Sequence, residues 1–313
     1  MRARLNGRIW KTAWPLALAA TVFLLCLFPF RALLNYHEQT HLFRWNAYYL
    51  KEQCQSVQGI AEYVASFITQ FFYIGWLGAL VMALLAVGIQ RISWLVLRLC
   101  RVRQMWLYPV SVLPPLLLFY FVFFPSLYRT DAQFRETVTY DYLVRAQKWR
   151  SILARSYNHQ PTTMCGVWCT NYALAKQGAL LDDMFLYKQD GPDGLLMDAV
   201  RMDPMALYSL SDICLDLGMV NTAERFAFDA KQRLPRGNKS GRLYSRLAQV
   251  CLINGHDKVA RKYMHMLKST LFYADCQFEV ERYRQLRQKG NDELAQNKSQ
   301  ILRQLVIENP QNQ

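Results

Sequence analysis

Apolar residues are concentrated in the first 125 residues of the chain, where they form three uncharged stretches of 18 or 19 residues. These stretches cover residues 13–30, 71–89 and 106–124. A helix needs about 20 apolar residues to cross the hydrocarbon core of a bilayer, which is about 30 Å thick. The pattern therefore predicts a transmembrane domain over residues 1–125 with three spans, the third of them bent by Pro114 and Pro115.

Residues 126–313 contain no comparable stretch and show the alternation of apolar and polar residues that is typical of water-soluble amphipathic helices. Two windows of this half superimpose at an offset of 37 residues. Each window predicts a helix, a turn with glycine at a left-handed cap, and a second helix that opens with a small residue. The matching positions are Leu207, Leu210, Cys214, Gly218 and Ala223 in the first window, and Tyr244, Leu247, Cys251, Gly255 and Ala260 in the second.

This pattern resembles the tetratricopeptide repeat, whose period is about 34 residues. Fainter units are expected around Gly178 and over Tyr140–Asn158, where the glycine is missing, and a capping helix is expected after Gly290. Because one repeat cannot bury its apolar face alone, the units should stack into a small α-solenoid over residues 126–313. The first helices of the pairs would line a concave groove, and its candidate lining residues are Tyr172, Tyr208, Asp212, Arg246 and Gln249. The predicted fold class is therefore all-α, with transmembrane helices followed by a tetratricopeptide-like α-solenoid.

Small residues recur along one face of the second predicted span, at spacings of four, four and three. They are Gly75, Ala79, Ala83 and Ala86. Helices associate closely in lipid where small residues let their backbones approach. This face is therefore predicted to pack against another helix.

The formal net charge of +14 comes largely from short segments beside the apolar stretches, since residues 1–124 carry 11 Lys and Arg against three acids. Such charges determine topology and contact lipid headgroups, and no nucleic-acid recognition motif accompanies them. Residues 1–12 and 90–104 together hold eight Lys and Arg residues. The loop over residues 31–60 and the twenty residues after the third apolar stretch together hold five. By the tendency of positive segments to stay in the cytoplasm, we expect a cytoplasmic N-terminus and an extracytoplasmic C-terminal domain.

One motif points to metal chemistry. His37, Glu38 and His41 fit H-E-x-x-H, which on a helix directs two imidazoles at one zinc ion and supplies a glutamate as general base. Glu62 could be a third ligand. A membrane zinc metallopeptidase is thus the alternative function. Solvated histidines near a membrane interface are the competing interpretation, and no edge strand is predicted that would hold an extended substrate.

Two segments resemble an uncharacterised bacterial multi-pass membrane family that is known only as a domain of unknown function. They are Gly59–Tyr63 with Phe67–Tyr73, and Asn171–Ala175 with Gly178, Met184, Phe185 and Gln189. The resemblance implies an inner-membrane protein with a tetratricopeptide-like tail and transfers no activity. Members carry more spans between these regions, and the segment that matches Tyr36–Phe43 keeps Glu-Gln rather than paired histidines.

Other catalytic signatures are missing from the sequence: there is no phosphate-binding glycine loop, no G-x-S-x-G elbow and no Cys-x-x-Cys. We therefore expect no cofactor and no catalytic activity. The leading hypothesis is a membrane-anchored helical-repeat protein that docks another protein or an extended peptide.

Overall fold

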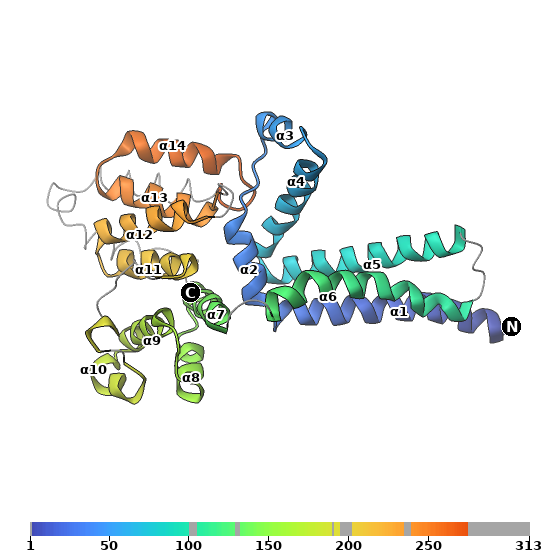
Figure 1. The fold of residues 1–313 in the computed structure, drawn as a ribbon, viewed down its shortest axis with the longest axis horizontal. Coiled ribbons are helices and arrows are strands. Elements are labelled where there is room, and N and C mark those ends of the chain that lie inside the picture. Colours follow the sequence, from blue (N-terminus) through green and yellow to red (C-terminus); the bar gives the residue numbers. More distant parts are fainter. Residues whose placement is uncertain are drawn as a thin grey trace. The chain divides into compact units, whose positions relative to one another are not determined.

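The computed structural model describes residues 2–99, 105–128, 132–189, 191–194, 202–234 and 239–274, and these residues form helices and turns without a strand (Figure 1). The expected all-helical fold is confirmed for this part of the chain. The helix predicted after Gly290 lies outside the described residues. The chain divides into two compact units, residues 1–38 with 71–131 and residues 39–70 with 132–313.

The first unit is built on two long helices, α1 (Arg2–Leu27) and α5 (Gly75–Leu99), which pack along each other. A 3₁₀ segment, η2 (Met105–Val112), packs on both of them and continues into α6 (Leu113–Tyr128). After α1 the chain bends by 73° into α2 (Arg31–Thr40), and η1 (Phe71–Tyr73) precedes α5.

The four small residues predicted to form a packing face all lie on the buried side of α5, the helix against which α1 packs. Ala79 is completely buried, and a Cβ atom at Gly75 would overlap the guanidinium of Arg31. Large apolar side chains, by contrast, point outward from the same helix: Leu84, Ile92 and Leu99 are 62%, 63% and 74% exposed. The small residues of α5 are therefore inside this unit, and most of its large apolar residues, apart from the buried Trp94, are outside.

The helices of the first unit differ in extent from the predicted spans. Only α5, within the described residues, is both long and apolar enough to cross a membrane as one helix, and it continues ten residues beyond the predicted end. The first stretch is part of a bent pair, α1 with α2, and Pro15 lies inside α1 instead of at its start. In the third stretch, Pro114 and Pro115 stand in the first turn of α6, where their missing N–H groups break no helical hydrogen bond, so the break falls between η2 and α6.

The second unit contains the remaining helices. Two of them come from the segment between α2 and η1, namely α3 (Ala47–Gln53) and α4 (Val57–Gln70). The others follow residue 131: α7 (Ala132–Arg145), α8 (Trp149–Asn158), α9 (Met164–Gln177), α10 (Leu180–Asp183), η3 (Met184–Leu186), η4 (Gly191–Gly194), α11 (Pro204–Asp216), α12 (Val220–Gln232), α13 (Gly241–Ile253) and α14 (Asp257–Lys268). The predicted boundary at residue 125 had placed α3 and α4 in the transmembrane domain, whereas their contacts group them with the C-terminal helices.

Four helical turns in this unit share one geometry. Each ends a helix with a residue at positive φ, namely Gln147, Gly178, Gly218 and Gly255 at 52°, 73°, 80° and 83°. In each, the amide of that residue bonds the carbonyl three residues back and the next amide bonds the carbonyl five back, as in a Schellman cap. The hairpins α7–α8, α9–α10, α11–α12 and α13–α14 are therefore built alike, although α10 has only four residues.

The apolar positions of the two aligned windows lie in the core. Leu210 and Leu247 are buried on the first helices, and Ala223 and Ala260 are completely buried on the second helices. Neighbouring helices along the chain pack in series from α11 to α14, while α7 packs on α9 and α11. The successive hairpins thus bury their apolar faces against one another.

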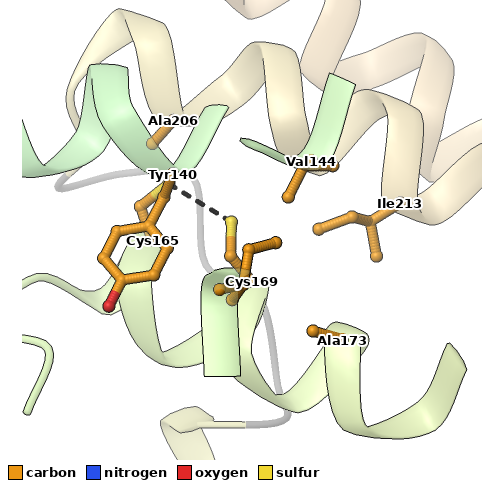
Figure 2. Close-up of a cluster of buried hydrophobic side chains, with 8 residues drawn as sticks. Tyr140, Val144, Cys165, Cys169, Ala173, Ala206 and Ile213 are labelled. Atoms are coloured by element: carbon orange, nitrogen blue, oxygen red, sulfur yellow. Dashed lines mark hydrogen bonds between the residues drawn. The ribbon is translucent and has the colours of Figure 1, made fainter. Parts of the chain in front are cut away.

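Two of the cysteines help to fill the core between α7, α9 and α11 (Figure 2). Cys165 and Cys169 lie one turn apart on α9 with their sulfur atoms 3.9 Å apart, and they pack with Tyr140, Val144 and Ile213. Both thiols are free. The contact with Cys169 and the burial of the site raise the pKa of Cys165 well above the usual value for a thiol. These cysteines serve as small buried side chains at neutral pH.

Candidate docking surface

The structure brings the predicted groove residues onto one face, formed by the first helices of three successive hairpins. Tyr172 lies on α9, Asp212 on α11, and Arg246 and Gln249 on α13. The Nε atom of Arg246 donates to Asp212 over 2.9 Å, and its NH1 atom donates to Gln249 over 3.0 Å. Because these side chains come from consecutive hairpins, they form a strip that crosses the helices.

Two further residues extend the strip towards α9. The hydroxyl of Tyr172 donates to the Asp216 carboxylate over 2.9 Å, and the ammonium of Lys176 lies 2.7 Å from the same carboxylate. The side chains of Arg246, Asp216 and Lys176 are 21%, 19% and 31% exposed. We call Tyr172, Lys176, Asp212, Asp216, Arg246 and Gln249 the polar strip. It carries two cations and two anions, and part of each charged side chain reaches solvent.

Beneath the strip lies a buried ion network that centres on Arg242 of α13. The NH1 atom of Arg242 lies 3.0 Å from both carboxylate oxygens of Asp141 on α7, and its Nε atom lies 3.1 Å from Asp212. Arg242 is 8% exposed and Asp141 is 1% exposed. Ser209 of α11 donates to Asp141 over 2.6 Å. The network therefore ties α7, α11 and α13 together through one guanidinium.

A further member of the network, Gln39, comes from residues 39–70, which are distant in the sequence from the other members. The side chain of Gln39 is completely buried, its Oε1 atom accepts from Arg242 over 2.5 Å, and its Nε2 atom donates to Asp141 over 3.3 Å. Further along the segment, the amide of Trp45 donates to the carbonyl of Ser269 over 2.7 Å. Gln39 near the end of α2 and Trp45 just before α3 thus both bond to the C-terminal helices of this unit.

Tyr208, which was predicted to line the groove, is only 1% exposed. The guanidinium carbon of Arg242 lies 5.4 Å from the centre of its ring, and its hydroxyl donates to the Gln39 carbonyl over 3.5 Å. Tyr208 therefore supports the buried network and does not face an open groove. The chain's own residues, Gln39 in particular, occupy the place that was expected to be open there.

The electrostatics of the strip follow from this pairing. Burial disfavours the charged form of Asp212, but the guanidinium groups of Arg242 and Arg246 outweigh it and lower the pKa of the carboxyl to about 2. Burial and the nearby Asp216 carboxylate raise the pKa of Tyr172. At neutral pH the carboxylate of Asp212 is therefore charged and Tyr172 keeps its proton, so both present fixed hydrogen-bonding groups.

The H-E-x-x-H motif does not lie on one continuous helix. His37 and Glu38 belong to α2, which ends at Thr40, so His41 follows the helix and receives or donates a 3.1 Å hydrogen bond with the Thr40 hydroxyl. Glu62 lies on α4. Among the residues that the structure describes, no group of three or more His, Cys, Asp and Glu side chains is placed to hold a metal ion.

Sequence reasoning identified four of the six strip residues but none of the three partners at the centre of the network. Asp141 is 102 positions from Gln39 and 101 positions from Arg242, and Gln39 and Arg242 are 203 positions apart. A charged residue at an otherwise apolar helix position was the available signal for Asp141 and Arg242. Gln39 lies within the H-E-x-x-H motif, and that pattern indicates His37, Glu38 and His41, not Gln39, as functional residues.

Comparison with known families gives one match. The model of a family of unknown function, DUF6057, matches residues 8–129 and 121–313. The chain belongs to this family. The expected resemblance to an uncharacterised family is thereby confirmed, and membership transfers no activity. No curated protein and no solved structure matches the chain.

Proposed function

We propose that this protein is a membrane-anchored, tetratricopeptide-like α-solenoid that docks an extended segment of another protein on its polar strip and has no catalytic activity of its own. The observation that carries the proposal is the strip itself, a row of partly exposed charged and amide side chains presented by three successive first helices. Held in place by one another, such groups lose little conformational freedom when they bind a partner.

The outer surface of the first unit supports attachment to a membrane. Large apolar side chains cover it on α1, α5 and α6, with Leu16, Leu84 and Leu117 at 69%, 62% and 52% exposed. The inside, in contrast, holds small residues and a polar pair, since Gln90 of α5 donates to Ser111 over 2.8 Å. Soluble proteins seldom expose so much apolar surface, whereas helices in lipid pack through small and polar residues.

The connectivity of the second unit supports three crossings. Residues 39–70 and residues 132–313 form one compact unit, so both segments lie on the same side of a membrane. If α5 crosses, the chain must cross back before residue 132. The segment η2 with α6 provides that return, because 8 residues of 3₁₀-helix and 16 of α-helix extend over about 40 Å. With α1 as the remaining crossing, the N-terminus lies on the opposite side from the second unit.

Charge sets the orientation that we propose. The basic N-terminal tail and the basic segment after α5 would lie in the cytoplasm, and the second unit would face outward. In line with the resemblance, the membrane would be the bacterial inner membrane. The polar strip would then recruit its partner outside the cytoplasm.

The docking proposal is tested by site-specific photo-crosslinking of the full chain in native membranes. A photoreactive residue at Gln249 should trap a defined partner, and the same residue at Arg225, which is exposed on α12, should not. Lys176→Gln removes one charge from the strip at a partly exposed position, so it should weaken the Gln249 crosslink at least several-fold without changing the amount of protein. Equal crosslinking from both positions, or no effect of Lys176→Gln, would refute the assignment of the strip.

A further inference from the structure

The hairpin of α3 and α4 presents an apolar and aromatic face to solvent. Trp45 and Tyr48 are 62% and 72% exposed, and Ile60 and Val64, one turn apart on α4, are 47% and 50% exposed. We call these four residues, together with Leu50, the hairpin face. They belong to the second unit, whose other helices bury most of their large apolar residues.

The opposite side of the hairpin is packed by its own aromatic cluster. The ring of Phe43, which is 1% exposed, lies 4.9 Å from Tyr63 and 5.2 Å from Phe67 of α4. Trp45 of the hairpin face also joins this cluster, with its ring centre 5.5 Å from that of Phe43 and 6.0 Å from that of Phe67, whereas Tyr48, Leu50, Ile60 and Val64 point to solvent. The hairpin therefore carries apolar side chains on both its packed side and its solvent-exposed side.

A basic cavity of about 300 Å³ adjoins the hairpin face and shares Trp45 with it. Its lining contains Arg44, His265 and Lys268 together with Asn46, and none of the described residues that line it is acidic. The Nε atom of Arg44 is buried without a hydrogen-bond partner, and the guanidinium stacks 5.2 Å above the ring of Tyr49. His265 and Lys268 are exposed in the last turn of α14. The cavity thus offers cationic donors, and its described lining provides no carboxylate to pair with them.

The C-terminal end of α14 lines the cavity. The C-terminal end of a helix carries a partial negative charge, which by itself would favour a cation. Here the last carbonyls are already occupied: Met266 accepts from the Ser269 hydroxyl, and Leu267 accepts from both the amide and the hydroxyl of Thr270. The two formal cations of the cavity exceed the remaining half charge of the helix end. An anion is therefore the favoured occupant.

The length of the connecting chain limits how far the C-terminal end of α4 can lie from the start of α5. Gln70, the last residue of α4, is five residues before Gly75, where α5 begins, so at most about 17 Å of extended chain separates them. Tryptophan and tyrosine favour the headgroup region of a bilayer, and amphipathic segments lie in that region with their apolar side inserted. Lysine and arginine near the surface attract anionic lipids.

We propose that the hairpin face rests on the headgroup region of the membrane and that the cavity of Arg44, His265 and Lys268 binds the phosphate of an anionic phospholipid. This inference rests on the membrane attachment argued above. It assigns the cavity to a lipid headgroup and makes binding of free phosphate an outcome of the test.

The position of the hairpin face is measured with the full chain in nanodiscs that contain lipids brominated near the headgroup. Fluorescence quenching of the wild type minus that of Trp45→Phe isolates the contribution of Trp45. Strong quenching of Trp45 is expected, since its ring would lie at the depth of the bromine atoms. A Trp45 contribution that the brominated lipid leaves unquenched overturns the proposal.

The cavity is tested by lipid selectivity, measured as retained phosphatidylglycerol relative to phosphatidylcholine by native mass spectrometry. Arg44→Gln/Lys268→Gln should lower the selectivity about 30-fold, since each cation near an anionic surface contributes about 1 kcal/mol. His265→Gln/Lys268→Gln changes only exposed residues of α14 and should also lower it. The matched control Arg225→Gln/Lys258→Gln removes two exposed charges that do not line the cavity, and it should leave selectivity unchanged.

The outcomes separate this inference from the proposed function. A protein that incorporates into nanodiscs but shows the same selectivity in all variants refutes the lipid site alone. A protein that remains soluble without detergent or nanodisc refutes the membrane attachment, and the lipid site with it. Displacement of phosphatidylglycerol by millimolar inorganic phosphate would assign the cavity to free phosphate and overturn the lipid assignment.

Discussion

Replacing Arg242 by leucine should destabilise the second unit more than any change on its surface. The substitution removes the counter-charge of Asp141, which is 1% exposed and would keep only the hydrogen bonds from Ser209 and Gln39. Removing one partner of a buried ion pair costs about 3–5 kcal/mol, because the other charge stays buried without compensation. In a unit of this size each kcal/mol lowers the midpoint of thermal unfolding by about 2–4 °C, so a decrease of roughly 10 °C is expected.

The assay is thermal unfolding of the full chain in detergent, followed by tryptophan fluorescence. A double-mutant cycle isolates the buried charge: Asp141→Asn removes the carboxylate, so Arg242→Leu/Asp141→Asn should cost about 1–3 kcal/mol less than the sum of the single variants. Arg225→Leu, at an exposed position of α12, is the matched control and should change stability by less than about 0.5 kcal/mol. Additive single effects, or a midpoint for Arg242→Leu within about 2 °C of the wild type, would refute the reasoning.

Four further outcomes are expected. Because the folded-state pKa of Asp212 is lowered to about 2 from 3.8, its contribution of about 2 kcal/mol is present above pH 4 and is lost as pH falls through 2, so Asp212→Asn should flatten the decrease in unfolding midpoint over that window. Gln147→Gly puts glycine at a position with positive φ and should raise the free energy of unfolding by up to about 1 kcal/mol, whereas Gly218→Ala should lower it by about 1 kcal/mol. Both changes are measured by thermal unfolding. The double change Gly75→Leu/Ala79→Leu should disrupt folding or assembly in detergent, seen by size-exclusion chromatography, because Ala79 is completely buried and a side chain at Gly75 meets Arg31. A C-terminal tag should resist protease in sealed inside-out vesicles, and its digestion there would reverse the orientation.

The repeat hairpins could be recognised from the sequence where their turns use glycine. At Gly218 and Gly255 the backbone adopts a positive φ, which glycine tolerates, and the apolar spacing around each turn is the same. The turn at Gln147 has the same hydrogen bonds but carries a residue that gives no such signal. That hairpin was therefore predicted only faintly, although its geometry matches the others.

Helical periodicity places a residue on a face but does not reveal what packs against that face. It put Asp212 and Arg246 on one face of the first helices, and in the structure their side chains are joined by a hydrogen bond. It could not show that Gln39 fills the centre of that side, since the contact between Gln39 and Arg242 joins residues 203 positions apart. The boundary drawn at residue 125 followed hydrophobicity alone, whereas the grouping of residues 39–70 depends on such long-range contacts.

The burial of Gln39 also links the two halves of the chain in folding. Residues 39–70 lie between α1 and α5 in the sequence, yet they contact the C-terminal helices of the second unit. Gln39 completes the buried ion network by accepting from Arg242, and the amide of Trp45 donates to the carbonyl of Ser269. A fragment that begins after α6 lacks both contacts, and its Arg242 and Asp141 must then be satisfied by water in the space that Gln39 fills. The C-terminal helices therefore reach their full set of hydrogen bonds only when the segment between the two long apolar helices packs against them. In the membrane topology that we propose, this segment must lie on the same side of the membrane as those helices, so the connectivity of the chain would couple insertion of α1 and α5 to folding of the second unit.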